Sequence, residues 1–238
     1  MRLRLGFATA VLAMLLGWPS AAEAQNRWNG IYVGANAGWQ WTDYTSELVG
    51  FPGLNVNDAV NTGIAGLHVG VQHQFGNFVL GLEGSYSGTG GSGFSDGTIA
   101  PSGDCLGAPP GGPGFTCQAK LTSLFMIGPR LGWSPSDQWL LFATGGWAKG
   151  HLSDRVLFGG NTVGSTSRSH DGWYLGGGIE YALTRNWSIG VEYTHIDFNT
   201  GFHCEIATLG GCAASEARNA SAETDIVRAR LTLTLGRP

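Results

Sequence analysis

The stretch GIYVGANAGWQW at residues 30–41 alternates strictly between two kinds of side chain. In a β-strand, successive side chains point to opposite faces of the sheet, so the two kinds would lie on opposite faces. One face would hold only apolar side chains, from Ile31 to Trp41, and the other would hold Gly, Asn, Gln and Tyr. A continuous apolar face opposite a polar one is typical of a strand that crosses a membrane within a β-barrel.

Seven further segments show the same alternation, so the sequence predicts eight strands in all. The predicted fold is all-β: an eight-stranded antiparallel transmembrane up-and-down β-barrel. A soluble β-sandwich would also alternate, but its outward face should be polar, whereas here the charges lie on the face opposite the apolar one. The further segments are Gly63–Phe75, Phe78–Tyr86, Lys120–Trp133, Trp139–Lys149, Trp173–Leu183, Trp187–Phe198 and Asp225–Leu235.

The segment Lys120–Trp133 carries two specific expectations. Its alternation places Leu121 on the lipid side and Thr122 and Arg130 in the lumen. Pro129 cannot donate a ladder hydrogen bond, so we expect a bulge or a local break of the sheet there.

The connections between the predicted strands alternate in length. Those near residues 76–77, 134–138 and 184–186 are short, and those near 43–60, 88–118, 150–170 and 199–222 are long and rich in Gly, Ser, Asn and Pro. Outer-membrane barrels have short turns on the periplasmic side and longer loops outside. We therefore expect short periplasmic turns and four long extracellular loops.

The first 24 residues have the features of a secretory signal peptide. Arg2 and Arg4 form a positive start, residues 5–17 are apolar, and Ala22-Glu23-Ala24 fits a small-x-small cleavage site. An N-terminal membrane anchor fits less well, because the apolar run is short and the cleavage site follows at once. We expect residues 1–24 to be removed on export to the cell outer membrane and residues 25–238 to form the barrel domain.

The composition supports a barrel and argues against other classes. Only 13% of the residues are charged and 11% are aromatic, whereas a soluble domain carries about 25% charged residues. After the first residues, no apolar run approaches the ~20 residues that a membrane helix needs. The net charge of −4 and the lack of a Lys/Arg run predict no nucleic-acid partner.

The four cysteines are an even number in a chain predicted to be exported, which favours disulfides. Three connectivities exist, and we prefer Cys105–Cys117 and Cys204–Cys212 because each pair closes a short Gly-rich segment. A metal site is the alternative. It lacks the tight Cys-x-x-Cys spacing that zinc sites usually show, although His203 adjoins Cys204. The sequence therefore assigns no metal and no cofactor.

Several strand motifs together resemble a known family. They include WNGIYVG at 28–34, LGLEG at 80–84, RLG at 130–132 and FATGG at 142–146. They resemble the porin-like outer-membrane immunogenic proteins of Gram-negative bacteria, an opacity-type group of eight-stranded barrels common in alphaproteobacteria. The resemblance covers the strands of the whole predicted mature chain. It also implies a terminal aromatic residue that the barrel-assembly machinery reads, and this sequence departs from that pattern because residues 233–238 read LTLGRP.

The inward face of the predicted strands carries charges of both signs. Buried charges are very costly unless they are paired, and eight strands enclose only enough space for side chains to fill. We expect a ladder of Glu–Arg pairs that largely plugs the lumen, and a narrow ion path lined by the same charges is the alternative. The residues of this lumen charge ladder are Glu83, Arg130, Glu180, Glu192, Arg228 and Arg230.

The sequence leaves two functions of different class open. One is a porin-like structural barrel, exposed at the surface, with at most a narrow pore. The other is a surface adhesin or ligand receptor, for example for haem, that acts through the extracellular loops, where binding functions concentrate. No Ser partner can be placed beside His195 and no triad motif is recognisable, so the sequence predicts no enzyme. The expected partners are outer-membrane lipid and lipopolysaccharide, the barrel-assembly machinery, and a host or surface ligand at the loops.

Overall fold

The computed structural model describes residues 27–48, 55–89, 95–97, 115–158, 161–204 and 217–235. The predicted signal peptide lies outside these residues. Cys105 and Cys212 also lie outside them, and so do both predicted disulfides. In the part of the chain that the structure describes, no helix is long and apolar enough to cross a membrane.

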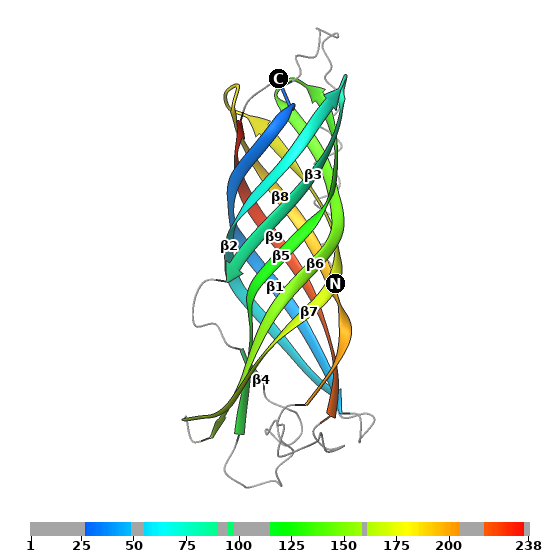
Figure 1. The fold of residues 1–238 in the computed structure, drawn as a ribbon. Coiled ribbons are helices and arrows are strands. Elements are labelled where there is room, and N and C mark those ends of the chain that lie inside the picture. Colours follow the sequence, from blue (N-terminus) through cyan, green and yellow to red (C-terminus); the bar gives the residue numbers. More distant parts are fainter. Residues whose placement is uncertain are drawn as a thin grey trace, which may run out of the picture.

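Eight long antiparallel strands form a closed barrel, as the sequence predicts (Figure 1). The barrel closes on itself because β1 pairs with β9 and β3 pairs with β5. A short element, β4 (Ser95–Gly97), adds to β5 at the end of the barrel away from the short turns. The long strands are β1 (Gly30–Leu48), β2 (Asn55–Phe75), β3 (Phe78–Thr89), β5 (Phe115–Ser136), β6 (Trp139–Phe158), β7 (Asn161–Ala182), β8 (Trp187–Cys204) and β9 (Ala217–Leu235).

Side chains alternate between the outer wall and the interior along the strands. Ile31 is 55% exposed, and the next residue, Tyr32, is fully buried. The register places side chains of the same face side by side, so that Ala35 lies opposite Leu67 on β2 and Leu231 on β9. The outer wall is an apolar surface, and the buried side chains include many polar and charged ones. This inside-out arrangement is that of a membrane barrel, and it confirms the predicted alternation.

One bulge in β5 reverses the predicted alternation at its outer end. Leu121 pairs with Leu152 and Ser123 pairs with His151, so Thr122 is an extra residue in β5. The prediction that Leu121 faces lipid is therefore wrong, and its side chain is buried, with 4% exposed. Thr122, predicted to point into the lumen, is only half-buried, and its hydroxyl donates a hydrogen bond of 2.8 Å to the carbonyl of His151. An extra residue shifts the two-residue period by one, which turns every side chain beyond it to the other face.

Pro129 lies at a local break between β5 and β6, which is one of the two outcomes predicted for it. The pairing skips Gly128 and Pro129 and resumes at Arg130 and Thr144 in the same register, so there is no bulge at this point. The carbonyl of Pro129 accepts a hydrogen bond of 3.1 Å from the hydroxyl of Thr144. The break is tolerated because β5 stays paired with β3 there, where Pro129 lies opposite Leu82.

The strands are longer than predicted, and they take up much of what was expected to be loop. Residues 43–48, 55–60, 115–118, 150–158, 161–170, 199–204 and 217–222 all belong to strands. Seven of the long strands have 18 to 22 residues, whereas about 9–11 suffice to cross a membrane. The predicted loop bounds are therefore wrong at these residues. Gly-, Ser- and Asn-rich sequence disfavours strands only weakly when continuous pairing with a neighbour compensates.

Two belts of exposed or half-buried aromatic side chains mark the membrane-spanning part of the barrel. Phe78 and Tyr86 on β3 lie in opposite belts, as do Trp139 and Trp147 on β6. Eight residue steps correspond to roughly 26 Å along a strand, or about 20 Å of height at a tilt of ~40°. The inner girdle, at the short-turn end, comprises Phe75, Phe78, Trp133, Trp139, Tyr181 and Trp187. The outer girdle comprises Trp39, Trp41, Tyr86, Phe125, Trp147, Trp173 and Tyr193.

The girdles predict how the cost of a surface charge depends on position. Leu82 lies midway between them, so Leu82→Arg should lower the free energy of unfolding by about 2–4 kcal/mol because it puts a charge in hydrocarbon. Asn61→Arg, on an exposed residue of β2 opposite Trp41 in the outer girdle, should change it by less than about 1 kcal/mol because it lies at the membrane interface. Urea unfolding of the barrel in lipid vesicles measures both. Equal costs would contradict this placement of the membrane.

Candidate functional site

The interior of the barrel contains six charged side chains at mid-height, each at most 5% exposed. They are Glu83 on β3, Arg130 on β5, Glu180 on β7, Glu192 on β8, and Arg228 and Arg230 on β9. All six are residues of the predicted lumen charge ladder. Three arginines face three glutamates, so the set carries no net charge.

Arg230 contacts all three glutamates and is the centre of this cluster. Its Nη2 lies 2.6 Å from Glu83 Oε2 and its Nε lies 3.2 Å from Glu180 Oε1. Its Nη1 forms an ion pair with Glu192. One guanidinium from β9 therefore joins β3, β7 and β8 across the lumen. The five donors of an arginine in a planar fork suit such multiple carboxylate contacts.

Arg130 and Arg228 extend the cluster to either side of Arg230. The Nη2 of Arg130 lies 2.8 Å from Glu180 Oε1, and its Nη1 lies 3.6 Å from Glu83 Oε2. The Nη2 of Arg228 lies 2.7 Å from Glu192 Oε1. Removing one partner from such a network leaves an unpaired buried charge, which costs about 3–5 kcal/mol.

The remaining three strands supply uncharged contacts to the same cluster. Tyr32 on β1 donates a hydrogen bond of 2.8 Å to Glu83, and Gln72 on β2 accepts one of 3.3 Å from Arg130. The ring of Phe142 on β6 lies under Arg130, with 4.0 Å from the guanidinium carbon to the ring centre. Every long strand thus contacts the cluster, which is why it can hold the barrel in one register.

Inward-facing glycines leave the space that these large side chains fill. A Cβ added at Gly70 would lie 2.3 Å from the hydroxyl of Tyr32, and one at Gly190 would lie 2.6 Å from Cγ of Glu180. The glycines on the inward faces are therefore part of the packing. The sequence contains a signal for this packing, because these glycines fall on the same alternate positions as the charges.

Two apolar layers lie above and below the charged cluster, and the sequence analysis missed both. On the outer side, the buried layer consists of Ile64, Leu124, Met126, Ala148, Tyr174, Ile196, Phe198, Ala222 and Ile226. At the short-turn end, Trp28, Val79, Leu140 and Ala182 form a second buried group. Their signal was the presence of apolar residues on the inward positions near the two ends of the predicted strands. Along the barrel axis, three successive layers of buried side chains thus occupy the lumen.

Two histidines toward the outer end of the barrel contact acidic or hydroxyl side chains. Groups of three or more His, Cys, Asp or Glu that could hold a metal are not found among these residues. On the outer wall, His195 contacts Asp225 at 2.8 Å. Both ring nitrogens of His151 contact serine hydroxyls, Ser169 at 2.9 Å and Ser167 at 2.8 Å. Because serine hydroxyls occupy both ring nitrogens, His151 lacks a contact with the carboxylate that orients the histidine of a Ser-His-acid triad.

Comparison with known proteins identifies the family. Residues 9–231 match the family described as the outer membrane protein beta-barrel domain. Because the match covers most of the chain, this chain belongs to that family and is an outer-membrane β-barrel protein. It is 25% identical over 209 residues to the 31 kDa outer-membrane immunogenic protein of Brucella melitensis biotype 1, covering 80% of this chain and 82% of the relative. The Brucella suis protein of the same name matches equally. These findings confirm the family resemblance of the strand motifs.

Solved structures of outer-membrane barrels are also similar to this chain. The outer membrane protease OmpT from Escherichia coli has a TM-score of 0.48 at 11% identity, covering 89% of this chain and 98% of that one. The attachment invasion locus protein Ail of Yersinia pestis has a TM-score of 0.38 at 13% identity, covering 86% and 99%. At such identities no activity transfers to this chain.

The charge cluster predicts that Arg230 contributes far more to the free energy of unfolding than an exposed arginine does. Arg230→Met leaves three glutamates with one contact fewer each, so it should lower the free energy of unfolding by about 3–5 kcal/mol. Arg185→Met, in the exposed turn between β7 and β8, should change it by less than about 1 kcal/mol. Urea unfolding in lipid vesicles compares the two. If both variants unfold at the same urea concentration, the cluster does not stabilise the barrel.

Alanine substitutions at two glycines on neighbouring strands distinguish the effect of lumen packing from the general effect of replacing a glycine. Gly70→Ala should destabilise the barrel by about 1–3 kcal/mol, because the new methyl group overlaps the Tyr32 hydroxyl. Gly84→Ala is the control. Its side chain would face outward, and the nearest heavy atom to the added Cβ is 3.8 Å away. Thermal unfolding followed by the heat-dependent shift in gel mobility measures both. An equal loss in the two variants would contradict close packing of the lumen.

Proposed function

We propose that this protein is a non-conducting outer-membrane barrel that anchors a β-structured outer part of the chain at the cell surface. The observation that carries the proposal is the succession of three buried layers in the lumen, namely the outer apolar layer, the charge cluster around Arg230 and the apolar group at Trp28. An eight-stranded barrel has an interior just wide enough for side chains to fill.

The charge cluster argues against an ion path because its charges already neutralise one another at short range. An ion passing Arg230 would have to replace contacts to three carboxylates that are shielded from water. It would then have to cross the outer layer at Phe198 and Ile226, whose apolar side chains cannot replace its hydration shell, with the neutral Gln40 lying opposite Ile226. Both steps cost free energy, so the barrel should be closed to ions and sugars.

Flux measurements test this function. Vesicles that contain the folded barrel should release small sugars and ions no faster than empty vesicles, while vesicles with a wide porin release them rapidly. Heat-dependent gel mobility confirms that the barrel is folded. Phe198→Ala together with Ile226→Ala thins the outer layer and should still give no flux, because the charge cluster remains. Steady flux through the folded wild-type barrel would contradict the proposal.

A second candidate function is recognition of a surface ligand, and the length of the strands favours it. β6 and β7 continue as a pair from Trp147 and Trp173 in the outer girdle to Phe158 and Asn161. About ten further residues per strand are more than a membrane anchor needs, and a paired extension holds whatever it carries in a fixed position. An adhesin or a receptor for a host or surface ligand such as haem would use this outer part.

Shortening the outer extension of the β6–β7 pair distinguishes the anchor function from the receptor function. His151 and Ser169 face each other in the β6–β7 pair, so a two-residue Asn-Gly turn can replace residues 152–168 and keep the register. The shortened barrel should fold and remain closed to solutes. If the protein is only an anchor, the shortened barrel and the full barrel should give the same adhesion of cells to host matrix and the same haem binding. A loss of adhesion or of haem binding in a shortened barrel that still folds would support the receptor function.

A further inference from the structure

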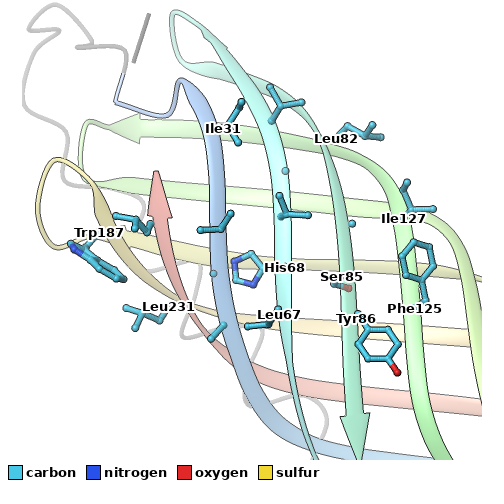
Figure 2. Close-up of a pocket in the computed structure, with 18 residues that line it drawn as sticks. Ile31, Leu67, His68, Leu82, Ser85, Tyr86, Phe125, Ile127, Trp187 and Leu231 are labelled. Carbon is cyan, nitrogen blue, oxygen red and sulfur yellow. The ribbon is translucent and has the colours of Figure 1, made fainter. Parts of the chain in front are cut away.

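The outer wall has a hollow in the membrane-spanning part of the barrel, mainly over β1, β2 and β3, and Gly84 of β3 is one of the residues that line it. Gly84 faces outward between Leu82 and Tyr86, and it lies opposite Val69 on β2 and Ile127 on β5. Because Gly84 has no side chain, the wall is recessed there, and the hollow that includes it measures about 960 Å³. Figure 2 shows Leu82 and Tyr86 on β3 and Ile127 on β5 at this hollow.

The hollow extends from Trp187 in the inner girdle to Tyr86 and Phe125 in the outer girdle, and Gly84 lies near its outer end. Gly84 is two residues from Tyr86, and its partner Ile127 is two residues from Phe125; both aromatic side chains belong to the outer girdle. Leu67 and Val69 complete an almost wholly apolar lining. An acyl chain of an outer-leaflet lipid would fill this space, while its headgroup would lie at the level of the outer girdle.

The charge just above the hollow differs from the charge around the rest of the barrel. Lys149 on β6 is exposed and lies opposite Phe125, which lines the hollow. Among the contacts of the described residues, Lys149 forms no ion pair with Asp171, its partner on β7. Beside the hollow there is thus a cation that can reach the phosphate of a lipid.

Apart from Lys149, the described outward charges at and beyond the outer girdle are acidic. They form an arc over β7, β8, β9 and β1 that begins at Asp171, opposite Lys149, and also includes Asp197, Glu223, Asp225 and Asp43. Described outward residues of β2, β3 and β5 at this level include no acid. A phosphorylated headgroup would be repelled by the acidic arc and attracted to the side that has Lys149 and the hollow.

We propose that the hollow at Gly84 and Lys149 together bind a phosphorylated acylated glycolipid of the outer leaflet, of the lipid A type. One acyl chain lies in the hollow and one headgroup phosphate contacts the Lys149 ammonium. This binding site is on the outer wall, so it is independent of whether the lumen conducts. It fixes the rotational position of the barrel relative to its lipid neighbours, with the acidic arc turned away from the bound lipid.

Native mass spectrometry of the folded barrel with diphosphoryl lipid A in a neutral detergent tests this site. Lys149→Ala should weaken lipid A binding about fivefold, as expected for one cation near an anionic headgroup, and Lys149→Arg should restore it. Gly84→Leu should also weaken binding, because the leucine side chain fills the hollow. Ala143→Leu, which adds three carbons on the exposed face of β6 where Gly84→Leu adds four, is the control and should bind as the wild type does.

Four outcomes would overturn a binding site made by the hollow and Lys149. They are wild-type binding by Lys149→Ala, wild-type binding by Gly84→Leu, equal weakening by Ala143→Leu and Gly84→Leu, or equal affinity of the wild type for an uncharged lipid with the same acyl chains. Heat-dependent gel mobility shows that each variant is folded, so a loss of binding cannot come from an unfolded barrel. An anionic diacyl phospholipid that binds as tightly as lipid A would assign the hollow to phospholipid and would contradict a glycolipid site.

Discussion

The structure depends on one buried guanidinium. Arg230 lies in the middle of the lumen and contacts Glu83, Glu180 and Glu192 from three other strands. Buried charges are tolerated only when their partners are in place, so those three strands can have only the register that brings their carboxylates to Arg230. A slip of one residue would turn a glutamate toward lipid and leave Arg230 short of a partner. The cluster therefore specifies the barrel's register as well as contributing to its stability.

The packing of the lumen and the functional surface both follow from that cluster. Large charged side chains fit into an eight-stranded barrel only where glycines such as Gly70 and Gly190 face them. The lumen is then occupied, and the apolar layers above and below the charges keep water away from them. If the barrel is closed to solutes, as we propose, the places left for specific interactions are the outer wall and the outer ends of the strands.

The sequence predicted the features that depend on alternation and missed those that depend on register. Strand number, the outward apolar face and the inward charges follow from the two-residue alternation of side chains. This alternation can be recognised within each strand segment by itself. The bulge at Thr122 could not be foreseen, because polarity around Leu121 fits either face. The partners of Arg230 could not be assigned, since pairing depends on how distant strands align. The outer ends of the strands were missed because they have no apolar face to mark them.

The most direct test of a filled, dry lumen is the rate at which the side-chain N–H of Arg230 exchanges with solvent deuterium. Nitrogen-15 NMR of the folded barrel resolves arginine Nε–H groups, and the exposed Arg185 provides the reference in the same molecule. In a sealed lumen, the N–H at the buried Arg230 Nε, which lies 3.2 Å from Glu180 Oε1, should exchange more slowly than that of Arg185 by orders of magnitude. Exchange at the rate of Arg185 would mean that water reaches the centre of the barrel, and it would contradict the sealed lumen.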